Sequence, residues 1–354
     1  YAGEDPDGFM SMPEVIEFIE EYAKFSTAPV KTHTTVQSVQ RHMDNYRVVT
    51  NRGVWHAKAV VIASGACNIA NKPRASEDVP TGIASLTAHD FQNADQLERG
   101  GVLVVGASAT GLQFADEIRK AGHEVTIAAG EHVRLPRTYR GRDIQFWMHS
   151  TGLLNESYEE IDDVSRARGL PSPQLVGSHD SQILDLNHLS DNGVKVVGRL
   201  MGINNGTAQF SGSLRNVCAL ADLKMGRLLE AIDDWIERNP VLCDAPERFE
   251  ATRVDDSPSL LLDLDDSNIR TIIWATGFRP DYSWLDVPVL DSKGRIRHEG
   301  GVVDASGMYV LGLPMLRRRK SSFIHGIEDD ARELMVHLAA YLEDGVELPG
   351  SQAA

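Results

Sequence analysis

Apolar side chains follow two repeating patterns along this chain. Three short runs are apolar on both faces, which is typical of strands inside a parallel sheet: residues 59–63, 102–105 and 272–275. Apolar side chains also recur every three or four positions, which predicts amphipathic helices at 15–23, 225–236 and 328–342, with a less regular helix near 156–168. Further strand-like segments occur at 36–50, 54–58, 194–200, 260–264 and 308–311. This mixture predicts an α/β fold.

One segment, residues 102–129, joins a strand, a small-residue turn, a helix and a second strand. The turn consists of Gly106, Ala107, Ser108, Ala109, Thr110 and Gly111. Such a turn directs backbone N–H groups and the positive end of a helix dipole to one point, where a phosphate can bind. Its outer glycines match the dinucleotide fingerprint G-x-G-x-x-G, with Ser108 in place of the middle glycine. The segment therefore predicts nucleotide binding, and a glycine turn needed only for packing is the alternative.

The residues after the second strand indicate which coenzyme this turn would bind. NAD sites place an acidic residue there to hold the ribose diol, whereas this chain has Ala129 and Gly130, followed by Glu131. Arg134 and Arg137 come next, and a guanidinium group suits the extra 2′-phosphate of NADPH. We therefore predict NADPH as the coenzyme and these two arginines as its ligands. A solvated basic loop is the alternative.

Charge and cysteine content exclude several other classes of function. The chain has 354 residues, with 35 Lys and Arg against 51 Asp and Glu and a formal charge of −16, which disfavours nucleic-acid partners. No apolar run approaches the roughly 20 residues of a membrane span, so we expect a cytoplasmic protein without membrane insertion. Cys67, Cys218 and Cys243 lie far apart in sequence, which favours neither a metal site nor a redox dithiol. We predict that all three are small buried apolar residues.

Two strand ends resemble each other, Val60–Gly65 and Ile272–Gly277. With Ala275-Thr276-Gly277-Phe278, the chain resembles the flavin-containing monooxygenase-like, FAD- and NAD(P)-dependent pyridine nucleotide oxidoreductases. The resemblance implies two Rossmann-like, three-layer domains, with the second inserted in the first. Residues 1–98 would then be part of an FAD-binding domain, 99–276 the NADP-binding domain and 277–354 the return to the FAD-binding domain.

The resemblance also implies which residues bind the cofactors FAD and NADPH. The chain would pass between the two domains at two strand ends. One strand end consists of Ser64 and Gly65, and the other of Ala275, Thr276 and Gly277. Gly312, Ser322 and Phe323 would lie beside the flavin, Gly312 after a late strand and the other two before the last helix. His325 is a candidate proton donor there, with a structural histidine as the alternative. Arg317–Lys320 would form a cationic rim, with a solvated turn as the alternative.

The chain differs from the family pattern at four places. No strand and G-x-G-x-x-G turn for the FAD diphosphate precede Ser11, so we expect that unit upstream of Tyr1 and the first domain to be truncated here. The monooxygenase signature F-x-G-x-x-x-H has only a degraded counterpart at Ile83–His89, and Leu313 stands where many relatives have Asp. The missing dithiol argues against the disulfide reductases that share this architecture.

These features predict an NADPH-dependent flavoprotein oxidoreductase of monooxygenase type. Hydride would pass from NADPH to FAD, and the reduced flavin would activate oxygen for a small-molecule substrate. One alternative is an NADPH-dependent reductase that transfers electrons without oxygenation. Another is a non-catalytic nucleotide-binding protein. The sequence leaves the substrate and the oligomeric state open.

Overall fold

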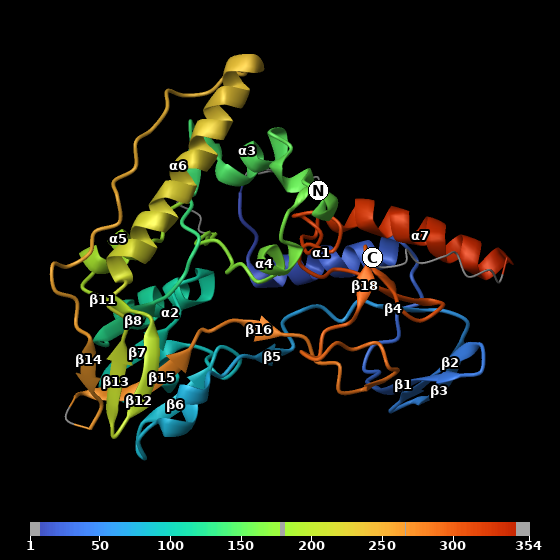
Figure 1. Cartoon of the computed structure of the whole chain (residues 1–354), viewed down its shortest axis with the longest axis horizontal. Coiled ribbons are helices and arrows are strands. Elements are labelled where there is room, and N and C mark those ends of the chain that lie inside the picture. The colour runs from blue at the N-terminus through green and yellow to red at the C-terminus, as the bar shows by residue number, and fades with distance from the viewer. Residues whose placement is uncertain (1–7, 178–180, 266, 345–354) are drawn as a thin grey trace. The chain divides into compact units, whose positions relative to one another are not determined.

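The computed structural model describes residues 8–177, 181–265 and 267–344, and the chain divides into two compact units (Figure 1). Unit 1 comprises the described residues of Tyr1–Ile69, Leu153–Arg168 and Arg279–Ala354, and unit 2 those of Ala70–Gly152 and Gly169–Phe278. Unit 2 is therefore an insertion in unit 1. Within that insertion, residues 153–168 return to unit 1. The first predicted boundary, at 98/99, differs from the observed one because residues 84–87 form a strand of the unit 2 sheet.

Unit 2 is built on a five-stranded sheet in the order β11-β8-β7-β15-β6. The strands are β6 (Ala84–Thr87), β7 (Gly101–Val105), β8 (Val125–Ala129), β11 (Lys195–Gly198) and β15 (Ile269–Trp274). All four neighbouring pairs are parallel, and every residue of β7 is buried, as its continuous apolar sequence predicts. This is the order of a Rossmann-like sheet, with the first strand of the βαβ segment in the middle.

Two further layers cover the faces of this sheet. Helices α2 (Ala109–Lys120), α5 (Leu186–Asp191) and the first turns of α6 (Leu214–Arg238) bury apolar side chains such as Leu112 on one face. A three-stranded antiparallel sheet, β12 (Leu200–Asn204), β13 (Thr207–Phe210) and β14 (Leu261–Asp263), covers the other. The remaining elements of unit 2 are η1 (Arg74–Asp78), η2 (Ala94–Gln96), β9 (Thr138–Tyr139), β10 (Arg142–Asp143) and α3 (Ile144–Ser150). Unit 2 thus has the three layers that the sequence predicts.

Unit 1 contains two four-stranded sheets, β18-β19-β20-β4 and β17-β1-β2-β3. Their strands are β1 (Val36–His42), β2 (Asn45–Thr50), β3 (Gly53–Ala57), β4 (Val60–Ile62), β17 (Leu285–Asp286), β18 (His298–Glu299), β19 (Val302–Val303) and β20 (Met308–Val310). The helical elements are α1 (Met12–Phe25), η3 (Leu153–Asn155), η4 (Tyr158–Glu160), α4 (Val164–Arg168) and α7 (Ile327–Asp344). β20 and β4 are parallel, and α7 packs Leu334 into the core they share. The short strands β5 (Ile69–Ala70) and β16 (Phe278–Arg279) lie where the chain passes between the units.

Strand β4 lies at an edge of its sheet among the described residues, and this corrects one expectation. Its apolar sequence predicts a strand covered on both faces, but Val61 is 36% exposed and only Ile62 is buried. Burial of the β4 side chains is therefore incomplete in the described part of unit 1.

Helix α1 is confirmed as an amphipathic helix, but its apolar face is not buried against other described residues. The Ser11 backbone N–H and hydroxyl both donate to the Glu14 carboxylate, at 2.6 and 2.7 Å, as the spacing for a capping box predicts. None of the helix residues is buried, and Ile16, Ile19 and Tyr22 are at least half exposed. A second correction concerns residues 156–168, which form two short helical turns, η4 and α4, in place of one helix.

The stability of unit 1 should depend on pH through His298 on β18. Burial, with a smaller effect of Arg168, lowers the pKa of His298 from 6.5 to about 4. The Gly301 N–H donates to its Nδ1 over 3.3 Å, which only a neutral ring nitrogen can accept. Between pH 6.5 and 4 the unfolded chain binds a proton at this histidine and the folded chain does not, so stability falls as pH falls.

A His298→Gln variant should remove that pH dependence. We expect the wild type to lose up to about 3 kcal/mol more than the variant between pH 7 and pH 4, as urea denaturation would measure. Parallel stability–pH curves for the two proteins would contradict the assignment.

Candidate functional site

The turn between β7 and α2 has the close backbone geometry that the fingerprint requires. Gly106 has φ +116°, and an ideal Cβ there would lie 2.2 Å from the Ala275 carbonyl oxygen. At Gly111 an ideal Cβ would lie 1.9 Å from the Gly106 carbonyl oxygen. Neither position accepts a side chain without moving backbone. The two glycines are therefore required by the close packing of the turn against itself and against Ala275.

Polar groups of the turn are available to an anion. Ser108 is the N-cap residue of α2, and its hydroxyl makes no capping hydrogen bond. The helix begins its hydrogen bonding at the Leu112 N–H, which donates to the Ser108 carbonyl over 3.1 Å. The N–H groups of Ala109, Thr110 and Gly111 precede that bond and have no partner within the helix. The residues present thus fit a pyrophosphate, since their N–H groups and the helix dipole favour negative charge.

Gln174 supports this turn, and no sequence motif identifies it. Its side chain is 2% exposed, and its Nε2 donates to the Ala107 carbonyl over 2.7 Å. Its own backbone N–H donates to the Val133 carbonyl over 2.8 Å. Gln174 lies in a stretch without helix or strand periodicity, so only the three-dimensional structure brings it to the turn.

Arg134 is wrong as a phosphate ligand, because buried carboxylates already occupy its guanidinium. The side chain donates to Asp185 over 3.1 and 2.7 Å and to Asp222 over 2.7 Å, and it also donates to the Glu250 carbonyl over 2.8 Å. Only 6% of the residue is exposed. Burial opposes the charge, but the hydrogen bonds to Asp222 and Asp185 outweigh it and raise the pKa of Arg134. The group is a permanent cation that holds three segments of unit 2 together.

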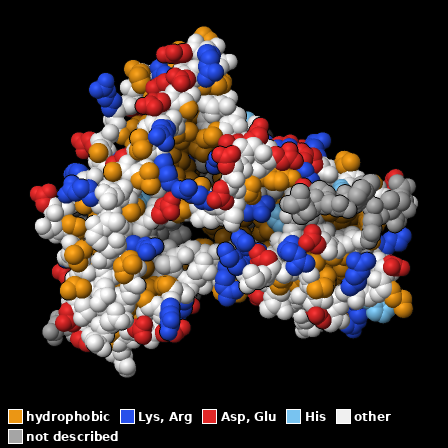
Figure 2. All heavy atoms as spheres, in the orientation of Figure 1, with side chains coloured by type: hydrophobic (Ala, Val, Ile, Leu, Met, Phe, Trp, Pro, Cys, Tyr) orange, Lys and Arg blue, Asp and Glu red, His pale blue; other side chains and the backbone are white. Residues whose placement is uncertain are grey.

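The other arginines of this basic segment also have internal partners. Arg137 is buried and donates to Asp143 over 2.6 Å, so its assignment to the 2′-phosphate is not supported either. Arg140 pairs with Asp233 at 2.8 Å, and the Arg142 guanidinium lies 4.5 Å from the centre of the Phe146 ring. Across the face drawn in Figure 2, basic and acidic side chains are interspersed. The segment is thus structural.

Two of the predicted flavin-side strand ends lie together in unit 1. β4 and β20 run parallel with Ile62 opposite Val310, so Ser64-Gly65 and Gly312 follow at the same edge of the sheet. Gly65 has φ +76° and Gly312 has φ +81°, and nothing approaches within 4 Å of a Cβ built on Gly65. The nearest atom to a Cβ on Gly312 is Ile327 Cδ1 at 3.5 Å, in the first turn of α7. The bends at Gly65 and Gly312 therefore lie at the same sheet edge, and the N-terminus of α7 is next to Gly312.

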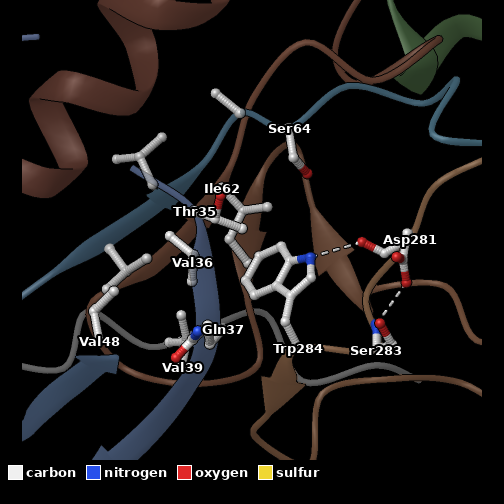
Figure 3. Close-up of a pocket in the computed structure, with 13 residues that line it drawn as sticks. Thr35, Val36, Gln37, Val39, Val48, Ile62, Ser64, Asp281, Ser283 and Trp284 are labelled. Carbon is white, nitrogen blue, oxygen red and sulfur yellow. Dashed lines mark hydrogen bonds between the residues drawn. The ribbon is translucent and has the colours of Figure 1, made fainter. Parts of the chain in front are cut away.

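A pocket of about 620 Å³ lies in unit 1 beside this edge (Figure 3). Its lining includes Val36 and Val39 of β1, the β4 residues, Ser64 and Trp284. In Figure 3 the Trp284 indole stands at the centre of the lining side chains. Its Nε1 donates to the Asp281 carbonyl over 2.9 Å, which fixes the ring. The pocket is mainly apolar, with the polar Ser64 at the strand end.

The basic quartet Arg317–Lys320 does not form a free cationic rim. Arg317 pairs with Glu333, Arg318 with Asp330 and Glu333, Arg319 with Glu156, and Lys320 with Asp329. The prediction of a rim for cofactor or substrate phosphates is therefore wrong. Its ion pairs instead connect it to α7 and to residues 153–168 within unit 1.

Arg318→Leu should destabilise unit 1 by about 3 kcal/mol, because Asp330 is fully buried and would lose its cation. Urea denaturation measures the loss. Adding Asp330→Asn removes the buried charge and should restore most of the stability. The exposed α7 pair Arg332–Glu328 provides the control, since Arg332→Leu should leave the denaturation curve unchanged. Equal effects of the two arginine variants would contradict the argument.

The remaining predicted site residues have varied surroundings. Ala275 packs behind Gly106 and Gly111, and the Thr276 hydroxyl donates to the Asn71 carbonyl. The Gly277 carbonyl accepts a 2.9 Å bond from the Asn71 N–H. Ser322 and His325 are exposed, with the His325 ring 5.6 Å from that of the half-buried Phe323. His89, from the degraded monooxygenase signature, is exposed and stacks on Phe278 at 4.9 Å. The roles of these residues in cofactor binding stay predictions.

The cysteines are all free, and one expectation about them is wrong. Cys218 is buried, and burial raises its pKa to about 11, which keeps the thiol protonated. Cys67 is exposed and Cys243 half-buried, so the three are not uniformly buried. Within residues 8–177, 181–265 and 267–344, no helix has the length and apolar character of a bilayer span.

Comparison with known proteins agrees with this geometry. The family model of the pyridine nucleotide-disulphide oxidoreductases matches residues 6–150. An uncharacterized CzcO-like oxidoreductase of Geobacillus kaustophilus is 28% identical over 336 residues, which are 94% of this chain and 79% of the relative. The uncharacterized oxidoreductase CzcO of Bacillus subtilis is 26% identical over 329 residues, covering 93% and 79%.

Solved structures share the fold at low sequence identity. A flavin-containing monooxygenase from Stenotrophomonas maltophilia superposes with a TM-score of 0.61 at 17% identity, covering 93% of this chain and 77% of that one. A bacillithiol disulfide reductase from Bacillus cereus superposes with a TM-score of 0.52 at 16% identity, covering 94% and 81%. The chain is therefore similar to pyridine nucleotide oxidoreductases, and it shares the two-domain FAD/NAD(P)-binding fold of the flavin monooxygenases.

Proposed function

We propose that this oxidoreductase uses NADPH to reduce FAD and then activates oxygen for a small-molecule substrate. The observation that carries the nucleotide part is the turn at Gly106–Gly111, where two side-chain-free positions and the start of α2 form a cradle for a pyrophosphate. When bound, NADPH supplies hydride, and FAD supplies the acceptor and the oxygen chemistry.

The chain's own residues bind and orient the cofactors. Gly106 and Gly111 allow the tight turn that presents the N-terminus of α2 to the coenzyme phosphates, and Gln174 holds the Ala107 carbonyl so that the turn keeps its shape. In unit 1, Gly65 and Gly312 leave the ends of β4 and β20 open to the flavin. Preorganised backbone groups of this kind bind an anion without having to reorganise first.

A coenzyme titration tests this proposal. Calorimetry with the purified protein should show saturable binding of NADPH, and a flavin absorbance spectrum should accompany the protein after addition of FAD. Binding of neither NADPH nor NADH would overturn the proposal. A protein that binds NADPH but takes up no FAD would instead support the non-catalytic alternative.

The product formed from oxygen distinguishes a monooxygenase from a reductase that does not oxygenate a substrate. The proposal predicts an oxygenated product in proportion to the NADPH consumed. The degraded signature is the feature that favours the reductase alternative, because Ile83 and Ser85 replace its Phe and Gly, and His89 stacks on Phe278. Stoichiometric hydrogen peroxide with every candidate substrate would support that alternative.

A further inference from the structure

One arginine, Arg199, lies at the carboxyl edge of the unit 2 sheet. Arg199 follows β11 directly, and β11 runs parallel to β8 with Gly198 opposite Ala129. The next residues on the two strands, Arg199 and Gly130, therefore lie side by side. This is the edge where a Rossmann-like domain receives the adenosine ribose, at the end of the second strand of the βαβ segment.

The stem of Arg199 lies over Gly130. A Cβ built on Gly130 would be 3.3 Å from both Cγ and Cδ of Arg199, and 3.6 Å from its Cβ. Any side chain at position 130 would have to displace these methylene groups. The lack of a side chain at the end of β8 thus allows the neighbouring strand to extend its arginine across that end.

The backbone of Arg199 is held firmly, while its guanidinium is left free of acidic partners. The Ser211 N–H donates to the Arg199 carbonyl over 2.9 Å, and a Cβ on Gly198 would lie 1.9 Å from the Ser211 carbonyl oxygen. The guanidinium itself donates to Met201 Sδ at 3.5 Å, a weak acceptor. Among the described residues no carboxylate pairs with Arg199, in contrast to the buried Arg134.

A lysine neutralises the one acidic side chain that follows Gly130. Lys224 of α6 places its Nζ 3.3 Å from Glu131 Oε1, and both groups are partly open to solvent. Without this cation, Glu131 would repel a phosphate at the end of β8. With it, the group formed by Arg199, Lys224 and Glu131 carries an excess positive charge on a strongly acidic protein.

We propose that Arg199, assisted by Lys224, binds the 2′-phosphate of NADPH and sets the preference for NADPH over NADH. The inference rests on the proposed function, because it names the residues that select the coenzyme of that same site. An arginine fork matches the geometry of a phosphate, and a cation that has no carboxylate partner has no ion pair to break before it binds one. This pair takes the place of Arg134 and Arg137, which are occupied inside unit 2.

Two nucleotide fragments test the inference without any need for turnover. Calorimetry compares adenosine 2′,5′-bisphosphate with adenosine 5′-monophosphate, which differ only in the 2′-phosphate. Arg199→Leu should weaken binding of the bisphosphate by about 10- to 100-fold and leave that of the monophosphate within twofold. Lys224→Leu should weaken the bisphosphate by about 3- to 10-fold, and Arg199→Lys should retain part of the preference. The exposed arginine variant Arg253→Leu is the matched control and should behave as wild type.

The outcomes separate the inference from the proposed function. If the wild type binds neither fragment and neither reduced coenzyme, the proposed function fails and the inference fails with it. If the wild type prefers the bisphosphate and Arg199→Leu keeps the same preference, only the inference is overturned. Equal weakening of both fragments by Arg199→Leu, or no preference in the wild type, also overturns it.

Discussion

Replacing Gly111 by Ala is expected to abolish NADPH binding and to lower the free energy of unfolding by about 3 kcal/mol. An ideal Cβ at this position lies 1.9 Å from the Gly106 carbonyl oxygen, so the turn between β7 and α2 must open to admit it. Opening moves the backbone N–H groups away from the point at which they converge. Calorimetry with NADPH and urea denaturation measure the two effects.

Two further variants show whether lost binding reflects the turn or general unfolding. Gly226→Ala lies inside α6 with nothing within 4 Å of its Cβ, so it should stabilise the chain by about 0.5–1 kcal/mol and leave NADPH binding unchanged. Ser108→Ala removes a hydroxyl that makes no capping bond, so it should keep the fold while weakening NADPH binding about threefold to tenfold. If the Gly111 variant bound NADPH within twofold of wild type, the turn would not be the coenzyme site.

Arg134→Leu should destabilise unit 2 by about 3–5 kcal/mol without changing the proposed preference for NADPH over NADH. The substitution leaves Asp185 and Asp222 without the cation to which both are hydrogen-bonded, and Asp185 is 5% exposed. Urea denaturation measures the loss of stability, and calorimetry with both coenzymes measures the preference.

Asp185→Asn in the same protein should recover part of that stability, because it removes one buried charge and keeps an oxygen to accept the His188 N–H at the start of α5. The matched surface variant is Arg253→Leu, whose partner Asp191 is exposed, and it should not shift the denaturation curve. A stable Arg134→Leu protein that had lost its selectivity for NADPH would reverse our assignment of Arg134 and Arg199.

The sequence predicts the centre of unit 2 well because local signals coincide there. β7 is a continuous apolar run, the glycines at 106 and 111 occupy positions that exclude a Cβ, and α2 begins where the small residues end. Pattern, turn chemistry and packing all favour the same βαβ segment. The same agreement holds for β20 and α7, whose bounds lie close to those expected.

The proposed coenzyme contacts could not be predicted in the same way, because they depend on long-range pairing. Arg134 follows β8 closely, but its partner Asp185 is 51 residues away in sequence and Asp222 is 88 away. Arg199 is remote from the turn in sequence and reaches Gly130 only through the parallel register of β11 and β8. Spacing along the chain detects neither relation.

The order of the strands in unit 1 also constrains how the protein folds during synthesis. β4 is made early, but its parallel partner β20 leaves the ribosome only after all of unit 2, roughly 10 to 50 s later at cellular rates of translation. Until then the apolar face of β4 lacks that partner. Early compaction of the inserted unit would shorten the intervening loop and bring the two strands within reach of each other. Variants that destabilise unit 2, such as Arg134→Leu, should therefore also lower the yield of correctly folded unit 1.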